Sequence, residues 1–262
     1  MRKTDLDYYQ TVTLVAPMRF ALDAVFTKSK IRRLSMINRM RDYLRLASSP
    51  SLLPLHAELN RSLYESAAQY DDYDYGEGYF YQSMAELGVS GLRDTDARVD
   101  AMTLRERLSG LTVLEIGCNA GFLANIIASV ARSITCLDTN SHLVDIARTA
   151  ARHSQKTNLT ALPVAFEDFT SSEGFDAVLS FANHSTYDGN TRQSVEEYFL
   201  RCRSLLRPGG LFLFESHAPA YEGDDIIEVC RLIETYFQLE HRSVLNYGTY
   251  LDRGRTFIVG RA

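Results

Sequence analysis

From residue 113 onward, short apolar segments alternate with longer amphipathic ones. The pattern predicts helices over 122–131, from residue 141 and over 224–236. It predicts strands from residue 113 and over 133–138, 159–166, 175–182, 211–215, 237–247 and 255–261. The run 175–182 is apolar almost throughout, which is typical of parallel strands covered on both faces. This alternation indicates an α/β fold with a largely parallel sheet.

The N-terminal part predicts two helices, over 26–46 and 55–69, with serines and prolines between them. The first helix carries an apolar stripe interrupted by basic residues: Met36, Ile37, Met40 and Leu44, with Lys30, Arg33 and Arg41. Such a stripe favours packing on the body of the protein or on a second subunit over membrane insertion. The sequence is compatible both with a homodimer and with a peripheral membrane contact through this basic helix.

Composition is consistent with a compact enzyme. The chain has 262 residues, 45% of them hydrophobic, which is enough for a large core. Residues 1–47 hold ten Lys or Arg and four Asp, although the net charge is −5, so a basic head precedes an acidic body. The four cysteines form no CxxC pair, so neither a zinc site nor a disulfide framework is predicted. No membrane span or signal peptide is predicted, and the cytoplasm is the expected compartment.

The segment 113–124 joins a buried strand, an acid and a glycine turn that opens a helix. Dinucleotide sites use the spacing G-x-G-x-x-G to bring backbone N–H groups to a pyrophosphate. Here three residues separate Gly117 from Gly121, and Glu115 stands just before them. A carboxylate at this place would repel a pyrophosphate. It suits a ligand with an ammonium group and no phosphate, such as S-adenosylmethionine.

These residues resemble the first motif of the class I S-adenosylmethionine-dependent methyltransferases, acid-x-G-x-x-x-G. Asp138 ends the second strand about 20 residues later, where βαβ units place a carboxylate for ribose hydroxyls. The segment 206–210 has the sequence Leu-Arg-Pro-Gly-Gly, another family feature, and is expected to end a helix before the fifth strand. The resemblance implies a doubly wound, Rossmann-like sheet of seven strands, one of them antiparallel. It divides the chain into an N-terminal helical cap and lid, 1–92, and a cofactor-binding core, 93–262.

The resemblance also implies which residues bind the cofactor and its product, S-adenosylhomocysteine. Asp138 would hold the ribose, although on residue type alone it could instead cap the following helix. Glu167 and Asp168 fall where the family holds the adenine, but could be ordinary loop acids. Cys118 and Cys136 fit small buried core residues. The expected cofactor contacts are Glu115, Gly117, Cys118, Asn119, Gly121, Phe122, Asp138, Thr139, Glu167, Asp168, Phe169, Phe181, Tyr81 and Arg98.

Tyrosines alternate with acids over 70–82, around two glycines. The resemblance makes this segment a lid over cofactor and acceptor, with Tyr79 and Tyr81 as the favoured contacts. The alternative is an acidic surface loop whose rings pack inward. Arg93 and Arg98 could reach the cofactor carboxylate, or pair with the nearby aspartates at 94 and 96.

Two histidines follow strands that end at the expected site. Transfer of a methyl group to a hydroxyl requires removal of a proton, which a histidine can accept near neutral pH. His184 follows the fourth strand and His217 the fifth, and ligands of doubly wound folds bind where strands end. His184 is the predicted base, and His217 a second base or an acceptor contact. No metal is predicted, although Asn183, Asp188 and Glu215 offer oxygen ligands that magnesium accepts.

The loop at 183–186, Asn-His-Ser-Thr, lacks the Pro-Pro-aromatic sequence of enzymes that methylate base amines. An acidic body without a basic stripe also disfavours nucleic acid as a partner. The sequence therefore predicts an S-adenosylmethionine-dependent O-methyltransferase acting on a hydroxyl of a small molecule or glycan. The alternatives are an N-methyltransferase of a small-molecule amine and a non-catalytic partner subunit with the same fold.

Overall fold

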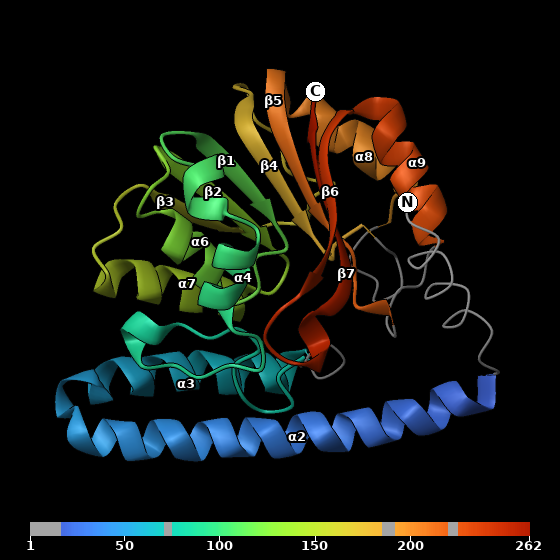
Figure 1. Ribbon diagram of the computed structural model, residues 1–262. Helices are drawn as coiled ribbons and strands as arrows, with labels where there is room; N and C mark the ends of the chain where they lie inside the picture. The colour runs from blue at the N-terminus through green and yellow to red at the C-terminus, as the bar shows by residue number, and fades with distance from the viewer. Residues whose placement is uncertain (1–16, 71–74, 185–191, 220–224) are drawn as a thin grey trace.

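Seven strands form a mixed sheet in the order β3-β2-β1-β4-β5-β7-β6 (Figure 1). The computed structural model describes residues 17–70, 75–184, 192–219 and 225–262. The strands are β1 (Thr112–Ile116), β2 (Ser133–Asp138), β3 (Leu159–Pro163), β4 (Phe175–Phe181), β5 (Leu206–Glu215), β6 (Gln238–Asn246) and β7 (Arg253–Arg261). Strands β1 to β5 are parallel, and β7 is antiparallel to both β5 and β6. The predicted Rossmann-like sheet with one antiparallel strand is confirmed.

Helices cover both faces of the sheet (Figure 1). One face packs against α4 (Thr95–Ala101), α5 (Leu104–Arg107), α6 (Phe122–Ile127) and α7 (Ser141–His153), and the other against α8 (Val195–Ser204) and α9 (Ile226–Tyr236). Successive side chains of a strand point to opposite faces. In β1, accordingly, Val113 joins the core on the first face and Leu114 the core on the second. The central strand β1 is therefore apolar on both sides, whereas the edge strand β6 is largely exposed.

Two N-terminal helices lie across the end of the sheet at which the parallel strands finish (Figure 1). These are α2 (Pro17–Ser48) and α3 (Leu53–Gln69), with the short 3₁₀ turn η1 (Pro50–Leu52) between them. Leu59 and Leu63 of α3 join a third apolar cluster with Phe122 and Leu143, which lie in the first turns of α6 and α7. None of the helices that the structure describes is long and apolar enough to cross a membrane.

Several predicted boundaries move by a few residues. The helix predicted over 122–131 ends at Ile127, and the strand predicted over 159–166 ends at Pro163. The segment 206–210 lies inside β5, not before it as expected. Pairing passes from Phe175↔Leu206 to Ala177↔Leu211, so the Arg-Pro-Gly residues form a bulge.

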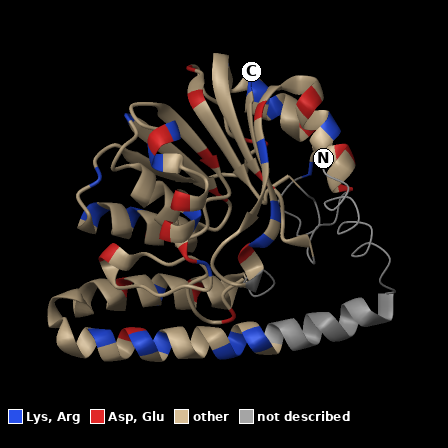
Figure 2. Cartoon of the chain, in the orientation of Figure 1, with Lys and Arg blue, Asp and Glu red and all other residues tan. Residues whose placement is uncertain are grey.

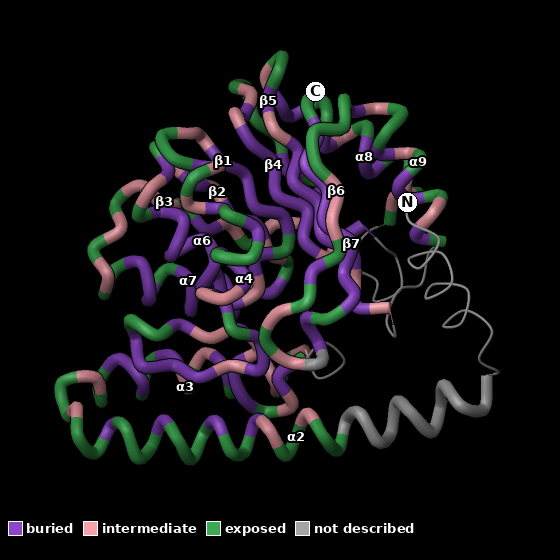
Figure 3. Tube along the Cα trace, viewed as in Figure 1, coloured by how far each residue is buried: buried purple, intermediate pink, exposed green. Residues whose placement is uncertain are grey.

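The apolar stripe of α2 does not pack on the body of the protein, and that part of the sequence prediction is wrong. Met36, Ile37, Met40 and Leu44 are all exposed. Figure 3 shows green, exposed segments along this part of α2. Polar residues of α2 face the body instead, because they find hydrogen-bond partners in residues 76–91.

Candidate active site

The loop between β1 and α6 packs so closely against neighbouring side chains that two of its positions require glycine. A Cβ atom added at Gly117 would lie 2.2 Å from Oδ1 of Asn183, and one at Gly121 would lie 2.3 Å from Cβ of Ala147. Both glycines also have φ near +65°, in the left-handed region that favours glycine. Asn119, between them, lies in the same region with a φ of 53°. The loop is thus packed closely against Asn183 and Ala147, and Gly117 remains exposed to solvent.

Glu115 stands at the end of β1 with its side chain almost fully buried. It is 3% exposed, and its Oε2 has no hydrogen-bond partner among the described residues. Burial raises the pKa of this carboxyl to about 8, against the opposing effect of the Arg98 charge. A buried carboxyl with one unsatisfied oxygen is costly unless a donor reaches it. Glu115 is therefore suited to accept a hydrogen bond from a cationic donor.

Arg98 of α4 lies on the other side of the same region. Its guanidinium carbon stands 4.8 Å from the centroid of the Phe181 ring, and Nη2 forms an ion pair with Glu215. Nε of Arg98 is buried and has no acceptor within the part of the chain that the structure describes. The site thus holds an unsatisfied donor near an unsatisfied acceptor, Glu115. The expectation that Arg98 pairs with Asp94 or Asp96 is wrong, since Asp94 caps α4 and Asp96 pairs with Arg105.

Asp138, at the end of β2, binds the backbone of the glycine loop. Its Oδ2 accepts a hydrogen bond from the Asn119 backbone N–H at 2.7 Å, and Oδ1 accepts one from the Asn140 N–H at 2.9 Å. Burial raises the pKa of Asp138 to about 6, in opposition to these backbone hydrogen bonds. The cap of α7 is Asn140, whose side chain accepts from the N–H groups of His142 and Leu143. The capping alternative for Asp138 is therefore wrong.

The residues expected to hold an adenine, 167–169, lie in the turn that follows β3. Glu167 and Asp168 both contact Arg192, through its backbone N–H and its guanidinium respectively, at the surface. The Phe169 ring is buried and lies 6.3 Å from that of Phe175. Cys118 and Cys136 are buried, as expected of core residues, and Thr139 is exposed beside Asp138.

His184 and His217 come together at the ends of β4 and β5. Their ring centroids are 5.3 Å apart, and the His184 ring packs edge-on against Phe214 at 4.9 Å. His184 is fully buried, whereas His217 is partly exposed. The loop 185–191, including Asp188, lies outside the described residues. The structure thus brings together the two histidines that the sequence singled out.

The tyrosine-rich segment divides between two environments. Residues 71–74 lie outside the described ranges. Tyr79 is buried and donates a hydrogen bond from its hydroxyl to Asp42 of α2 at 2.7 Å, so it packs inward. Tyr81 lies beside Arg93, whose guanidinium carbon is 6.0 Å from the ring centroid.

Gln82 is a site residue that sequence reasoning missed. Its Nε2 donates to the carbonyl of Cys118 at 3.2 Å, and its Oε1 accepts from the N–H of Phe122 at 3.0 Å. One buried side chain therefore bridges the middle of the glycine loop and the first residue of α6. A lone glutamine in a tyrosine-rich segment carries no signal of this role.

A buried ionic network was also missed, and it surrounds Glu215. Arg93 donates to Glu215 at 2.9 Å, to Asp252 at 2.5 Å and to the Tyr247 hydroxyl at 2.7 Å. The charges of Arg93, Arg98 and Arg255 hold the pKa of the Glu215 carboxyl well below its usual range despite burial. Because both oxygens of Glu215 are bound by arginines, it is not placed to serve as the magnesium ligand considered from the sequence. The described residues contain no group of three potential metal ligands.

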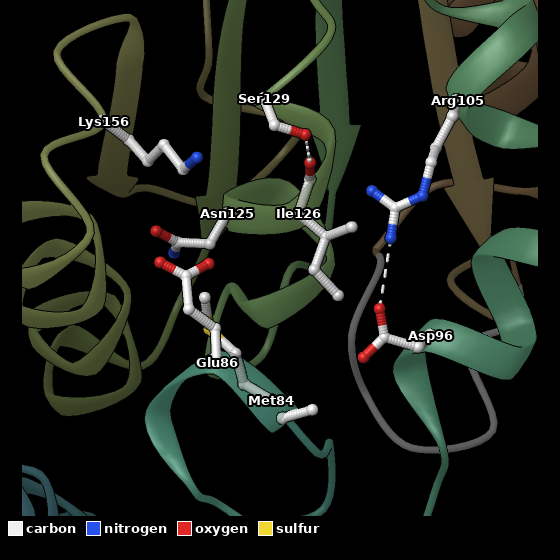
Figure 4. Close-up of a pocket in the computed structure, with 9 residues that line it drawn as sticks. Met84, Glu86, Asp96, Arg105, Asn125, Ile126, Ser129 and Lys156 are labelled. Atoms are coloured by element: carbon white, nitrogen blue, oxygen red, sulfur yellow. Dashed lines mark hydrogen bonds and ion pairs between the residues drawn. The ribbon is translucent and has the colours of Figure 1, made fainter.

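A separate small cavity of about 150 Å³ lies between η3 (Ala85–Leu87), α4, α5 and α6 (Figure 4). Its lining includes Glu86, Asp96, Asn125 and Lys156, but none of the residues Glu115, Asp138 and His184. Ligand sites for drug-sized molecules usually measure several hundred Å³. This cavity is therefore too small to be the cofactor site.

Residues 113–210 match the model of the methyltransferase domain family. This stretch runs from β1 through the glycine loop, Asp138 and β4 into β5. Residues 113–210 thus form a methyltransferase domain. The match begins at the acid-and-glycine motif that resembles the class I S-adenosylmethionine-dependent methyltransferases.

Solved structures share the fold at low sequence identity. The bifunctional kinase-methyltransferase WbdD is 20% identical with a TM-score of 0.55, covering 70% of this chain and 44% of its own. The N-methyltransferase NodS from Bradyrhizobium japonicum WM9, in complex with S-adenosyl-L-homocysteine, is 16% identical with a TM-score of 0.52, covering 64% and 92%. The [4+2]-cyclase SpnF also matches, at 14% identity, 64% and 85% coverage and a TM-score of 0.53. Since a cyclase shares it, the fold alone does not determine the reaction.

Curated relatives are similar over about two fifths of the chain. The ubiquinone biosynthesis O-methyltransferase of Roseobacter denitrificans is 33% identical over 112 residues, covering 40% of this chain and 41% of that protein. The protein of the same name from Rhizobium leguminosarum is 32% identical over 106 residues, covering 40% and 39%. The chain thus matches about two fifths of the length of these relatives.

Proposed function

We propose that this protein transfers a methyl group from S-adenosylmethionine to a hydroxyl of a small molecule or sugar. The observation that carries the cofactor assignment is the pair of buried, unsatisfied and complementary groups, Glu115 Oε2 and Arg98 Nε. An amino-acid moiety has an ammonium group for the first and a carboxylate for the second. The match to the methyltransferase domain family supports the same ligand.

The remaining contacts follow from the positions of the loop residues. Asp138 has oxygen lone pairs in addition to those that bind Asn119 and Asn140, and would accept from ribose hydroxyls. Glu167, Asp168 and Phe169 would lie along the adenine, and Phe181 along the cofactor beside Arg98. The backbone from Gly117 to Phe122, including Cys118, would line the amino-acid end, with Thr139 next to the ribose and Tyr81 on the lid.

The preference for a hydroxyl acceptor is supported by the histidine pair and by the names of the curated relatives. When bound, S-adenosylmethionine supplies an electrophilic methyl group for an in-line displacement. Much of the acceleration of such a step comes from alignment of the reactants. His184 would accept the hydroxyl proton at a ring nitrogen as the oxygen attacks. The His217 ring, whose centroid lies 5.3 Å from that of His184, would act as a second base or bind the acceptor.

Calorimetry with two ligands tests the cofactor site. S-adenosylhomocysteine has the amino-acid moiety, and methylthioadenosine lacks it. We expect Glu115→Gln to weaken S-adenosylhomocysteine about tenfold or more, because it removes a charged hydrogen bond, and to leave methylthioadenosine within about twofold. Arg98→Met should shift the ratio of the two affinities in the same direction. Glu106→Gln, an exposed acid of α5, is the matched control. An unchanged ratio in both site variants would contradict the assignment.

Turnover with separate pools of hydroxyl and amine acceptors tests the reaction. S-adenosylhomocysteine release should appear with hydroxylated small molecules or sugars, and His184→Ala should lower it by about 10²-fold or more, as for loss of a general base. His153→Ala, an exposed histidine at the end of α7, should leave turnover unchanged. Turnover with amines alone would favour the N-methyltransferase alternative. Binding without turnover on any pool would favour a non-catalytic subunit.

A further inference from the structure

Helix α2 is amphipathic in the opposite sense to that of a helix packed on a core. Polar residues face the body of the protein, and Ser35, Asn38 and Asp42 are all buried there together with Leu46. The residues on its outer side are large and apolar, with Met40 59% exposed and Leu44 75% exposed. A contiguous exposed apolar patch of this kind marks an interaction site.

Polar contacts fix which side of α2 faces outward. Ser35 donates to the carbonyl of Gly76 at 2.5 Å, and Asn38 donates to that of Gly91 at 2.8 Å. Asp42 accepts from the Tyr79 hydroxyl at 2.7 Å and from the Ser90 N–H at 2.6 Å. Rotation of the helix to bury its apolar side would leave these buried groups unpaired, which is costly. The apolar side therefore stays at the surface.

The outer side of α2 also carries basic residues, although Arg32, Arg39 and Arg45 contact Glu77, the Gly78 carbonyl and Asp42 instead. Over 29–48 the helix has six Lys or Arg and a single acid, Asp42, which is buried. Figure 2 shows the basic residues spaced along this part of the helix. At 100° per residue, Arg33 lies within the apolar stripe and Arg41 at its margin, and both are exposed. We call the surface formed by Arg33, Met36, Ile37, Met40, Arg41 and Leu44 the α2 outer face.

We propose that the α2 outer face docks on an anionic lipid surface. Lipid headgroups offer negative charge for Arg33 and Arg41, and the acyl boundary beneath them accepts the side chains of Met40 and Leu44. A second copy of the chain fits less well, because two such faces would bring arginines together, and residues 29–48 of α2 have no exposed acid to pair with them. A docked α2 would lie in the membrane plane without crossing it. This inference is independent of the proposed methyl transfer.

Docking would also set where the candidate site lies relative to the membrane. The inner side of α2 holds residues 76–91, and this segment contains Gln82, which contacts the glycine loop. In a docked molecule, α2 and the segment 76–91 would lie between the lipid surface and the glycine loop.

Vesicle sedimentation tests this proposal without reference to activity. The full chain is mixed with phosphatidylcholine vesicles, with and without phosphatidylglycerol, at low and high salt. We expect binding only to the anionic vesicles, and we expect it to weaken with salt. Arg33→Glu and Arg41→Glu should each lower the partition coefficient about fivefold or more. The double variant M40E/L44E should abolish binding, whereas Leu200→Glu, at a 43% exposed leucine of α8, should bind normally.

Light scattering of the same proteins tests whether a second copy of the chain, and not lipid, covers the α2 outer face. A dimer that M40E/L44E converts to a monomer would show that a second copy covers this face, and would overturn the proposal. Equal binding to neutral and anionic vesicles, or equal loss in Leu200→Glu, would overturn it too. Because all substituted positions are exposed, circular dichroism should show unchanged helix content in each variant.

Discussion

The side chain of Asn183 lies directly against Gly117. Its Nδ2 donates to the carbonyl of Ile116 at 2.6 Å, and a Cβ atom at Gly117 would lie 2.2 Å from its Oδ1. The contact joins the end of β4 to the end of β1 and leaves no room for a side chain in the loop. The residue that precedes the candidate base His184 therefore also shapes the candidate cofactor loop.

Gly117→Ala should weaken S-adenosylhomocysteine binding at least about tenfold, because the methyl group must displace Asn183 or the loop. The positive φ of 64° adds a backbone strain of about 1 kcal/mol. Gly110→Ala separates the two effects: its φ is 72°, but no atom lies within 4 Å of the added Cβ. We expect that control to lose similar stability by thermal denaturation and to keep its affinity by calorimetry. Equal loss of affinity in both variants would contradict the steric argument.

Ligand binding should release a proton from Glu115. In the protein without ligand the pKa of the Glu115 carboxyl is about 8, so at pH 7 this carboxyl is mostly protonated. An ammonium group beside it favours the ionised form, so binding near neutral pH should release close to one proton. Calorimetry in buffers of different ionisation enthalpy measures this number. Release should vanish in Glu115→Gln and persist in Glu106→Gln, and proton uptake in the wild type would contradict the prediction.

Gln82→Leu should weaken binding of S-adenosylhomocysteine about tenfold by freeing the glycine loop from α6. It should also lower the free energy of unfolding by about 1–3 kcal/mol, since buried groups of Cys118 and Phe122 lose their partner. Asn158→Ala provides the comparison, because Asn158 donates to the carbonyl of Ala128 at 2.9 Å, just past the far end of α6. That variant should lose stability and retain affinity. A similar loss of affinity in both variants would show that Gln82 acts only on global stability.

Glu215→Gln should lower the free energy of unfolding by about 3–5 kcal/mol, because Arg93 and Arg98 then lose their buried counter-ion. The exposed pair Glu240–Arg261 offers the contrast, and Glu240→Gln should cost less than about 1 kcal/mol. Urea denaturation measures both values. Equal costs would contradict the role of the network.

The two buried glutamates should give opposite dependences of stability on pH. The pKa of Glu215 is lowered on folding, so its stabilisation is present above its unfolded value near 4.5 and is lost as pH falls below it. The pKa of Glu115 is raised, so stability falls as pH rises from about 4.5 through about 8. Melting temperatures across this range check both signs. Glu215→Gln should flatten the acid limb, and Glu115→Gln should flatten the alkaline limb.

Local pattern predicted the strands and the glycine loop well, because each rests on residues adjacent in the chain. Boundaries were less accurate where pairing decides them, as at the bulge in β5, where Leu206 pairs with Phe175. Residue types marked Glu115, Asp138, His184 and His217, and the fold brings each to the strand ends where they were expected. Gln82 gave no such signal, since its role depends on two backbone groups about 40 positions away.

By itself the sequence determined the α/β class, the succession of strands along the chain and the cofactor motif, because hydrophobic periodicity and glycine turns act over a few residues. Only the tertiary structure decided the partners of the buried charges. Arg93 and Asp252 are 159 positions apart and meet because β7 inserts beside β5. It also decided which side of α2 faces outward, since that depends on hydrogen bonds to residues 76–91 and not on the apolar stripe itself. Burial and pairing are properties of the assembled sheet, and a one-dimensional pattern does not contain them.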